Sequence, residues 1–179
     1  FGNNNFVGVG STGRIVRSTD NGSTWNNSTS PITSTLYGVS FGNNNFVGVG
    51  STGRIVRSTD NGSTWDNSTS GITTDLNGVT FGNNTFVAVG DSGKIVRSTD
   101  NGTTWSNSTS GITTDLKGVT FGNNTLVAVG DSGKILRSTD DGSSWENSTS
   151  GISSDLYGVT FGNDTFVAVG QSGKILRST

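Results

Sequence analysis

The sequence predicts an all-β fold built from a tandem repeat, and three observations carry the prediction. A near-identical unit recurs every 40 residues, each copy opening with a phenylalanine at Phe1, Phe41, Phe81, Phe121 and Phe161. Each unit holds short apolar runs separated by Gly, Asn and Asp, which is typical of strands joined by tight turns. No segment repeats its apolar residues at the helical spacing of about 3.6.

The unit from Gly111 to Ser150 shows the expected elements in order. We expect four short strands, at residues 116–121, 125–130, 134–138 and 144–148. The turn residues between them predict antiparallel hairpins. In the preceding unit the second strand is apolar at consecutive positions, from Phe86 to Val89. A half-exposed strand would alternate, so both faces of this strand must be covered.

A four-stranded unit of about 40 residues has the size of a β-propeller blade. Radially packed sheets cover both faces of each other, as the continuous apolar strand requires. The alternative is a β-solenoid, but its coils repeat at shorter periods and lack a tryptophan turn. The sequence therefore predicts a β-propeller of four-stranded antiparallel blades.

The repeats divide the chain into residues 1–40, 41–80, 81–120, 121–160 and a partial copy at 161–179. The chain holds five first halves but only four tryptophan halves. We expect a single propeller domain over residues 1–179, with five blades of which the first lacks its inner strand and the last its outer strand. The alternatives are a fragment of a larger ring, or closure by a second chain. Exposed strand edges at both termini favour self-association.

The composition limits the partners of the chain. Only 28% of residues are hydrophobic, which would suggest disorder in a chain without periodicity. The 11 basic and 13 acidic residues are spread evenly, so no basic stripe is expected to bind nucleic acid. The longest apolar runs have about four residues, far fewer than the roughly 20 of a membrane span.

The chain contains no cysteine and no histidine. Disulfides, thiolate or imidazole metal sites and a Ser/His/Asp triad are therefore excluded. Aspartate-rich turns attract calcium, but the spacing of a calcium loop is absent. We expect no metal and no cofactor. Without a recognisable signal peptide the localisation stays open, with a bacterial extracellular or cell-surface location favoured.

The phrase from Ser98 to Trp105, Ser-Thr-Asp-Asn-Gly-Thr-Thr-Trp, recurs with small changes in four of the units. Its aspartate is suited to accept backbone N–H groups of the turn, its glycine to adopt positive φ, and its tryptophan to cover the hairpin. We expect a structural role for all four copies, at Ser18, Asp20, Gly22, Trp25, Ser58, Asp60, Gly62, Trp65, Ser98, Asp100, Gly102, Trp105, Ser138, Asp140, Gly142 and Trp145.

This phrase resembles the Asp-box, or bacterial neuraminidase repeat, of sialidases, other glycoside hydrolases and many non-catalytic propellers. The resemblance implies a propeller in which the box lies between the third and fourth strands of a blade, away from the active face. The surrounding phrase, from Phe81 to Ile95, is similar to repeats of bacterial propellers of unassigned role. It is more distantly similar to the photosystem II assembly-factor propellers.

The catalytic groups that the sialidase resemblance implies are not reproduced. Sialidases use an arginine cluster, a tyrosine–glutamate pair and an aspartic acid. This chain has one glutamate, Glu146, next to a tryptophan, and two tyrosines, Tyr37 and Tyr157. Its repeated carboxylates lie in equivalent settings, whereas a glycosidase needs two with separate roles. We therefore expect no enzymatic activity.

One variable position marks the candidate binding site. It lies where the chain enters the inner strand, on the face where propellers commonly bind ligands. The candidates are this position and the nearby loop aspartates: Tyr37, Asn77, Lys117, Tyr157, Asp75, Asp115 and Asp155. Such side chains can stack on a sugar or reach a peptide. Drift of surface residues after duplication is the alternative.

We thus expect a non-enzymatic binding or structural scaffold, with repeated glycan or protein sites that gain avidity on a multivalent target. Two alternatives stay open. In the first, the chain is a fragment of a sialidase-like glycoside hydrolase without its catalytic loops. In the second, it is an engineered or trimmed example of blade duplication without an evolved ligand.

Overall fold

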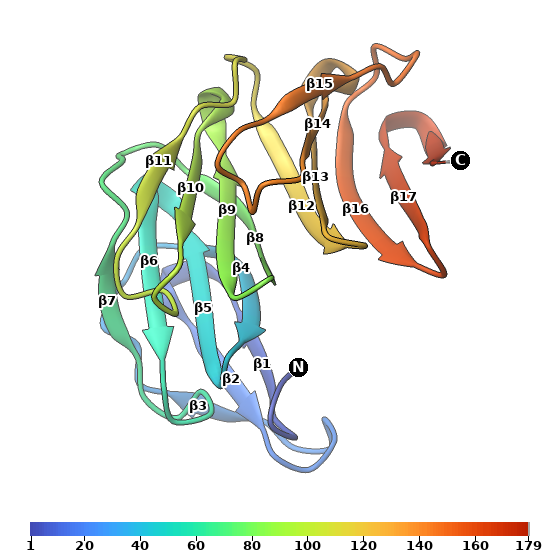
Figure 1. Cartoon of the computed structure of the whole chain (residues 1–179). Coiled ribbons are helices and arrows are strands. Elements are labelled where there is room, and N and C mark those ends of the chain that lie inside the picture. The colour runs from blue at the N-terminus through green and yellow to red at the C-terminus, as the bar shows by residue number, and fades with distance from the viewer. Residues whose placement is uncertain (179) are drawn as a thin grey trace.

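The computed structural model describes residues 1–178, which form five antiparallel β-sheets side by side in an arc (Figure 1). Three sheets have four strands, paired in chain order. The second sheet contains β4 (Leu36–Gly42), β5 (Asn45–Gly50), β6 (Arg54–Ser58) and β7 (Asp66–Thr69). The third contains β8 (Leu76–Gly82), β9 (Thr85–Gly90), β10 (Ile95–Ser98) and β11 (Ser106–Ser108). The fourth contains β12 (Leu116–Gly122), β13 (Thr125–Gly130), β14 (Ile135–Ser138) and β15 (Glu146–Ser148).

The two terminal sheets have three strands each. The first contains β1 (Phe6–Val9), β2 (Ile15–Ser18) and β3 (Asn26–Ser28), and so lacks an inner strand. The fifth contains β16 (Leu156–Gly162), β17 (Thr165–Gly170) and β18 (Ile175–Arg177), and has no outer strand among the described residues. The predicted all-β fold, with antiparallel blades and incomplete first and last blades, is confirmed. Within residues 1–178 no strand pairing joins the first sheet to the fifth, and the arc is open (Figure 1).

Each sheet has two ends that differ in chemistry. One end, the loop face, carries the segments that lead into the inner strands and a 3-10 turn after each second strand: η1 (Ser11–Gly13), η2 (Ser51–Gly53), η3 (Asp91–Gly93), η4 (Asp131–Gly133) and η5 (Gln171–Gly173). The opposite end, the turn face, carries the Gly-Asn-Asn and tryptophan turns. In the described part of the chain no helix has the length and apolarity to span a membrane.

The fourth strand is shorter than the sequence suggests. We expected it at residues 144–148, but β15 begins at Glu146. Ser144 and Trp145 belong to the turn instead, because the Ser144 hydroxyl donates to Asp140 and the Trp145 indole to the carbonyl of Gly142. The tight turn before the second strand is as the sequence implies, with Asn43 and Asn44 both at positive φ (46° and 61°).

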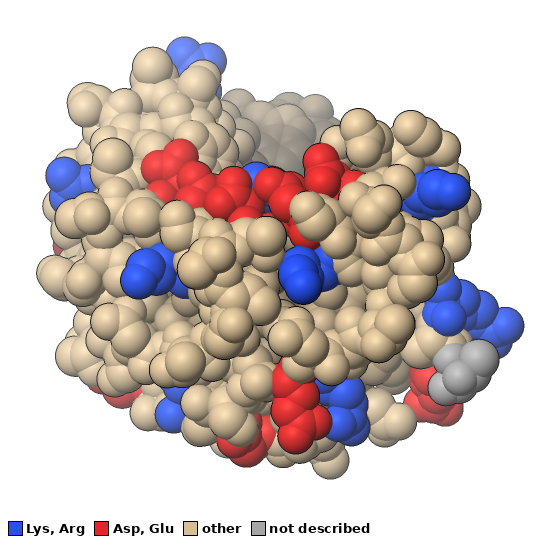
Figure 2. Space-filling model, turned by 90° about the horizontal axis from the view of Figure 1, so that it is seen from above, with Lys and Arg blue, Asp and Glu red and all other residues tan. Residues whose placement is uncertain are grey.

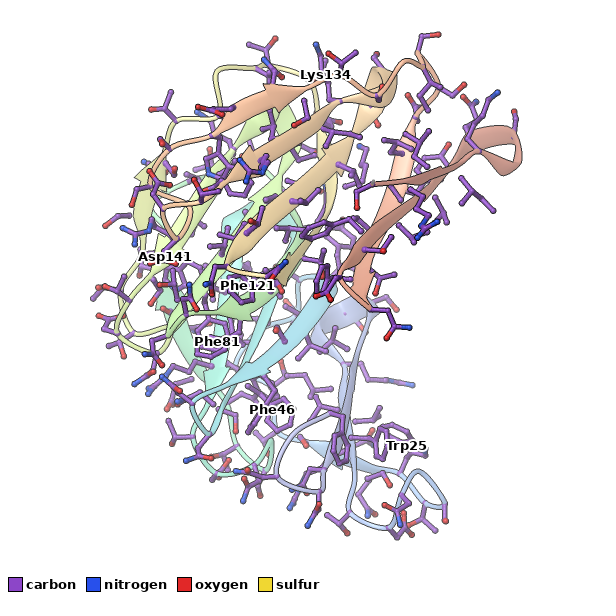
Figure 3. The ribbon with its side chains drawn as sticks, turned by 45° about the vertical axis from the view of Figure 1, so that its right-hand side comes forward. Trp25, Phe46, Phe81, Phe121, Lys134 and Asp141 are labelled. Carbon is purple, nitrogen blue, oxygen red and sulfur yellow. The ribbon has the colours of Figure 1, made fainter. Side chains whose placement is uncertain are left out.

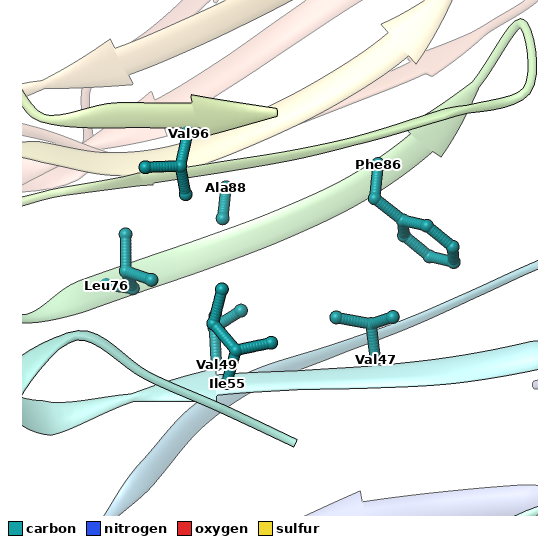
Figure 4. Close-up of a cluster of buried hydrophobic side chains, with 7 residues drawn as sticks. All are labelled: Val47, Val49, Ile55, Leu76, Phe86, Ala88 and Val96. Atoms are coloured by element: carbon teal, nitrogen blue, oxygen red, sulfur yellow. The ribbon is translucent and has the colours of Figure 1, made fainter. Parts of the chain in front are cut away.

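The apolar core lies between the sheets. Val47, Val49 and Ile55 of the second sheet pack against Leu76, Phe86, Ala88 and Val96 of the third (Figure 4). Equivalent residues form the cores between the first and second, the third and fourth, and the fourth and fifth sheets. Alternate residues of one strand thus face the next sheet and the preceding sheet, which explains why the Phe-Val-Ala-Val strand is apolar throughout.

Phenylalanines from one sheet cover glycines of the sheet before. The Phe81 ring lies against the α-carbon of Gly42, where a Cβ would overlap the ring. The same contact joins Phe41 to Gly2, Phe121 to Gly82 and Phe161 to Gly122. Phe46, Phe81 and Phe121 follow the arc, whereas Trp25 lies at its end (Figure 3).

Candidate functional site on the loop face

The tryptophan turns are held by hydrogen bonds within each turn. In the third repeat, Asp100 accepts the backbone N–H of Thr104 at 2.9 Å and its hydroxyl at 2.6 Å. The Ser98 hydroxyl donates to Asp100 at 2.8 Å and accepts the N–H of Gly102 at 2.9 Å. The Trp105 indole N–H donates to the Gly102 carbonyl at 3.2 Å. The aspartate is therefore fully engaged in its own turn.

These hydrogen bonds stabilise the ionised form of the aspartate. The hydroxyl and N–H of Thr24 lower the pKa of Asp20 to about 2, and those of Ser144 lower the pKa of Asp140 to about 2. Burial raises the pKa of Asp100, but the hydrogen bonds from Thr104 outweigh it and bring the pKa to about 2. The pKa of Asp60 is lowered in the same way, against burial. A general acid needs the opposite shift.

The loop aspartates hold neighbouring sheets together. Asp75, just before the third sheet, accepts the N–H of Thr52 at 2.8 Å, and Thr52 is at positive φ (55°) in η2 of the second sheet. Asp115 does the same for Ser92 at 2.9 Å, and Asp155 for Ser132 at 2.9 Å. The first repeat has Thr35 at the equivalent position. Sequence reasoning missed this bond, because its two partners lie 23 residues apart in different sheets.

The variable position lies beside these aspartates at the start of each inner strand. The Tyr37 hydroxyl donates to the free oxygen of Asp75 at 3.2 Å, and its ring is 47% exposed. Burial and then the charge of Asp75 raise the pKa of Tyr37. Asn77 donates to Asp91 and to the carbonyl of Leu116, both at 2.9 Å.

The other two variable residues differ from each other in their contacts. The Lys117 ammonium lies 3.0 Å from Asp115 and 3.5 Å from Asp131. Burial lowers the pKa of Lys117, but the hydrogen bond and charge of Asp115 outweigh it and raise the pKa. Tyr157 is 54% exposed. The structure thus brings the sequence-predicted candidates together on one face.

Carboxylates gather on the loop face near the axis of the arc. Figure 2 shows them as a band in the middle of this face. Five aspartates form this acidic band, and all are partly exposed: Asp75, Asp91, Asp115, Asp131 and Asp155. Lys117 bridges two of them. The band gives this end of the molecule a negative local potential, although the net charge is only −2.

A polar groove recurs in consecutive repeats on the same face. In the third repeat it has a volume of about 730 Å3 and lies between η3 and the segment from Asn107 to Thr114. In the fourth repeat it has about 630 Å3 and is lined by residues 40 positions later, including Ser132, Asn147 and Ser150. Lys134 lies at both grooves (Figure 3). Hydroxyl and amide groups dominate the walls.

A further cavity of about 540 Å3 lies between the fourth and fifth sheets. Val127, Phe161 and Leu176 are among its lining residues. Between other sheets a tryptophan such as Trp105 or Trp145 packs in this place. Among the described residues no tryptophan packs between the fourth and fifth sheets, and the cavity lies at that place. Over residues 1–178 no three Asp or Glu side chains come together to hold a metal ion.

The sequence matches no protein-family model and no curated protein. The fold is similar to solved structures. "YCF48 bound to D1 peptide" is 18% identical with a TM-score of 0.74, over 99% of this chain and 61% of that chain. YCF48 from Cyanidioschyzon merolae is 19% identical with a TM-score of 0.70, over 96% of this chain and 62% of that chain.

The computationally designed Ika8 protein is 14% identical with a TM-score of 0.76, over 99% of this chain and 56% of that chain. The chain thus spans about three fifths of the length of these proteins. At these identities the similarity establishes the fold alone, a β-propeller of antiparallel blades.

Proposed function

We propose that the chain is a non-enzymatic scaffold that binds a protein segment on its loop face. The observation that supports this most is the exposure of Tyr37 and Tyr157 at the variable position, beside the acidic band. Tyrosines are enriched at protein interfaces because a rigid ring buries much area and its hydroxyl still finds a partner. The propeller YCF48, which shares the fold, has a structure bound to a peptide.

The charge of the band selects the kind of segment. Each of the loop aspartates Asp75, Asp115 and Asp155 uses one carboxylate oxygen on a backbone N–H. The second carboxylate oxygen of Asp75 accepts the Tyr37 hydroxyl, and that of Asp115 accepts the Lys117 ammonium. A segment with lysine or arginine would complement the acidic band and associate faster at low salt.

The absence of enzymatic activity is part of the proposal. The tryptophan-turn aspartates are engaged in their turns, and each loop aspartate holds a backbone N–H of the neighbouring sheet. Neither set separates an acid from a base, as glycoside hydrolysis requires. Release of a fluorophore from glycosides, abolished by one carboxylate change, would instead identify a hydrolase fragment.

The repeated grooves favour a second candidate, multivalent glycan binding. Grooves of similar lining lie 40 residues apart and offer hydroxyl and amide groups to a sugar. Several weak sites would gain avidity on a polymeric glycan. Tight binding to a polymer with no detectable binding to its monosaccharide would favour this candidate over a protein segment.

Selection of a random peptide library on the immobilised chain tests the main proposal. We expect basic peptides with micromolar affinity, weakened about tenfold or more by the double change Tyr37→Ser and Tyr157→Ser. Asp66→Ser is the control, because it removes a carboxylate from the exposed outer strand β7, away from the acidic band. Selected peptides that bind the double variant equally well would refute the site, and a library without binders would refute the function.

A further inference from the structure

Four large apolar side chains are exposed at the two ends of the arc. They are Phe1 (67% exposed), Trp25 (47%), Val169 (48%) and Ile175 (70%). Their equivalents in the second sheet are less exposed: Val49 and Ile55 are at 0%, Trp65 is at 5%, and Phe41 is partly buried. The exposure therefore comes from position in the arc and not from a change of residue type.

The two exposed ends are different faces of the same kind of sheet. The outward face of the fifth sheet presents Val167, Val169 and Ile175, which correspond to the residues that contact the next sheet elsewhere. The outward face of the first sheet presents Phe6 and Trp25, among others, and corresponds to the face that contacts the preceding sheet. Each end thus has the surface that the other end is built to cover.

We propose that the two terminal sheets of this 179-residue chain pack face to face between molecules, with the first sheet of one copy on the fifth sheet of another. The chain's own interfaces between sheets show what covers such a face, namely a sheet of the same sequence. The contact continues this established interface from one molecule to the next. It joins sheet faces and does not require a new strand pairing.

Specific contacts follow from those between the inner sheets. Among the described residues, no atom lies within 4 Å of the place that a Cβ on Gly162 would take, whereas Gly42, Gly82 and Gly122 are each covered by a phenylalanine ring. Phe1 of the second copy would cover Gly162. Gly22, equally open, would lie over Val167 as Gly62 lies over Val7.

Polar groups on the turn face extend the same match. Asn43 donates to Asn84 at 3.2 Å and to Asn101 at 3.0 Å in the next sheet, and the Arg57 Nε donates to the carbonyl of Asn101 at 2.7 Å. By the same spacing, Asn163 and Arg177 would donate to Asn21 of the second copy. The net charge of −2 opposes such an association only weakly.

A contact between two different faces is heterologous, so it adds copies in one direction and gives a closed ring or an open chain. Within one copy the two faces do not meet, because Trp25 and Ile175 both stay exposed. Association of copies removes this apolar surface from water, which is favourable at about 25 cal/mol per Å2.

Solution mass as a function of concentration is the first test. We expect masses above the 18.4 kDa of one chain at micromolar concentrations. Ile175→Lys should restore the single-chain mass, while Asp66→Ser, at an exposed residue on the outer strand β7 of the second sheet, should leave the association unchanged. Far-ultraviolet circular dichroism checks that both variants fold. A single-chain mass at every concentration would overturn the proposal and leave the faces to another occupant.

Cross-linking decides which faces meet. The chain has no cysteine, so Asn163→Cys and Asn21→Cys each introduce a single reactive site. A short bifunctional maleimide should join the two variants when they are mixed and should join neither variant to itself. The pair Asn43→Cys and Asn101→Cys in one chain is the positive control. Efficient self-joining of the Asn21→Cys variant would show a symmetric contact and overturn the proposal.

Discussion

The ring of Phe121 lies against the α-carbon of Gly82 in the neighbouring sheet and leaves no room for a side chain. We expect Gly82→Ala to reduce the free energy of unfolding by about 1–3 kcal/mol, because the ring must move in a packed interface. Urea denaturation measures this. The matched control is Gly162→Ala, which has no described atom near its Cβ position and should be neutral at concentrations where the chain is monomeric. Equal effects of the two changes would contradict the account.

The same pair of changes also separates folding from association. At higher concentration Gly162→Ala should weaken the association of copies, since Phe1 of the second copy would need the space that the new methyl group occupies. The measurement is again the solution mass. An unaltered mass would show that this glycine lies outside the contact.

The four tryptophans should differ in their importance for stability. Trp65 is 5% exposed and packs between the first and second sheets, whereas Trp25 is 47% exposed. We expect Trp65→Ala to cost about 3–5 kcal/mol of unfolding free energy, and Trp25→Ala clearly less. Chemical denaturation of both variants checks the difference. Similar costs would mean that Trp25 is covered in solution.

The tryptophan-turn aspartates predict a loss of stability in acid. Their pKa values in the folded chain, about 2 for Asp20, Asp100 and Asp140, lie below the unfolded value of about 4. Their contribution is complete above the unfolded value and is lost as pH falls through the folded value. Changing the three to asparagine should therefore flatten the fall in stability between about pH 5 and about pH 2. Denaturation across this range, compared with the unchanged chain, gives the result; parallel curves would exclude these groups.

The first repeat lacks a hydrogen bond that the others have. Thr35 stands where Asp75, Asp115 and Asp155 accept a backbone N–H from the preceding turn. We expect Thr35→Asp to stabilise the chain by about 0.5–1.5 kcal/mol, by supplying an acceptor to the N–H of Thr12. Thr35→Asn, with one neutral acceptor oxygen, should stabilise less. A stability decrease for both would indicate that the first turn differs from the rest.

The sheets and their turns could be predicted from the sequence, because a 40-residue period and local turn residues such as Asn43 and Gly102 determine them. The sequence also placed Tyr37 and Lys117 on one face, since equivalent positions of a repeat must lie together. It was insufficient for contacts between neighbouring sheets. The bond from Thr52 to Asp75, and the bonds from Asn43 to its two neighbours, depend on how sheets stack in space. No local sequence pattern specifies how two neighbouring sheets are placed relative to each other.

Every interface in the arc is generated by residues at fixed offsets along the chain, such as the phenylalanine 39 positions after the glycine it covers. Nothing in one interface depends on how many others exist. The gene could therefore gain or lose whole 40-residue units by unequal recombination without disturbing any surviving contact. The curvature between adjacent units would then limit how many units fit into one ring.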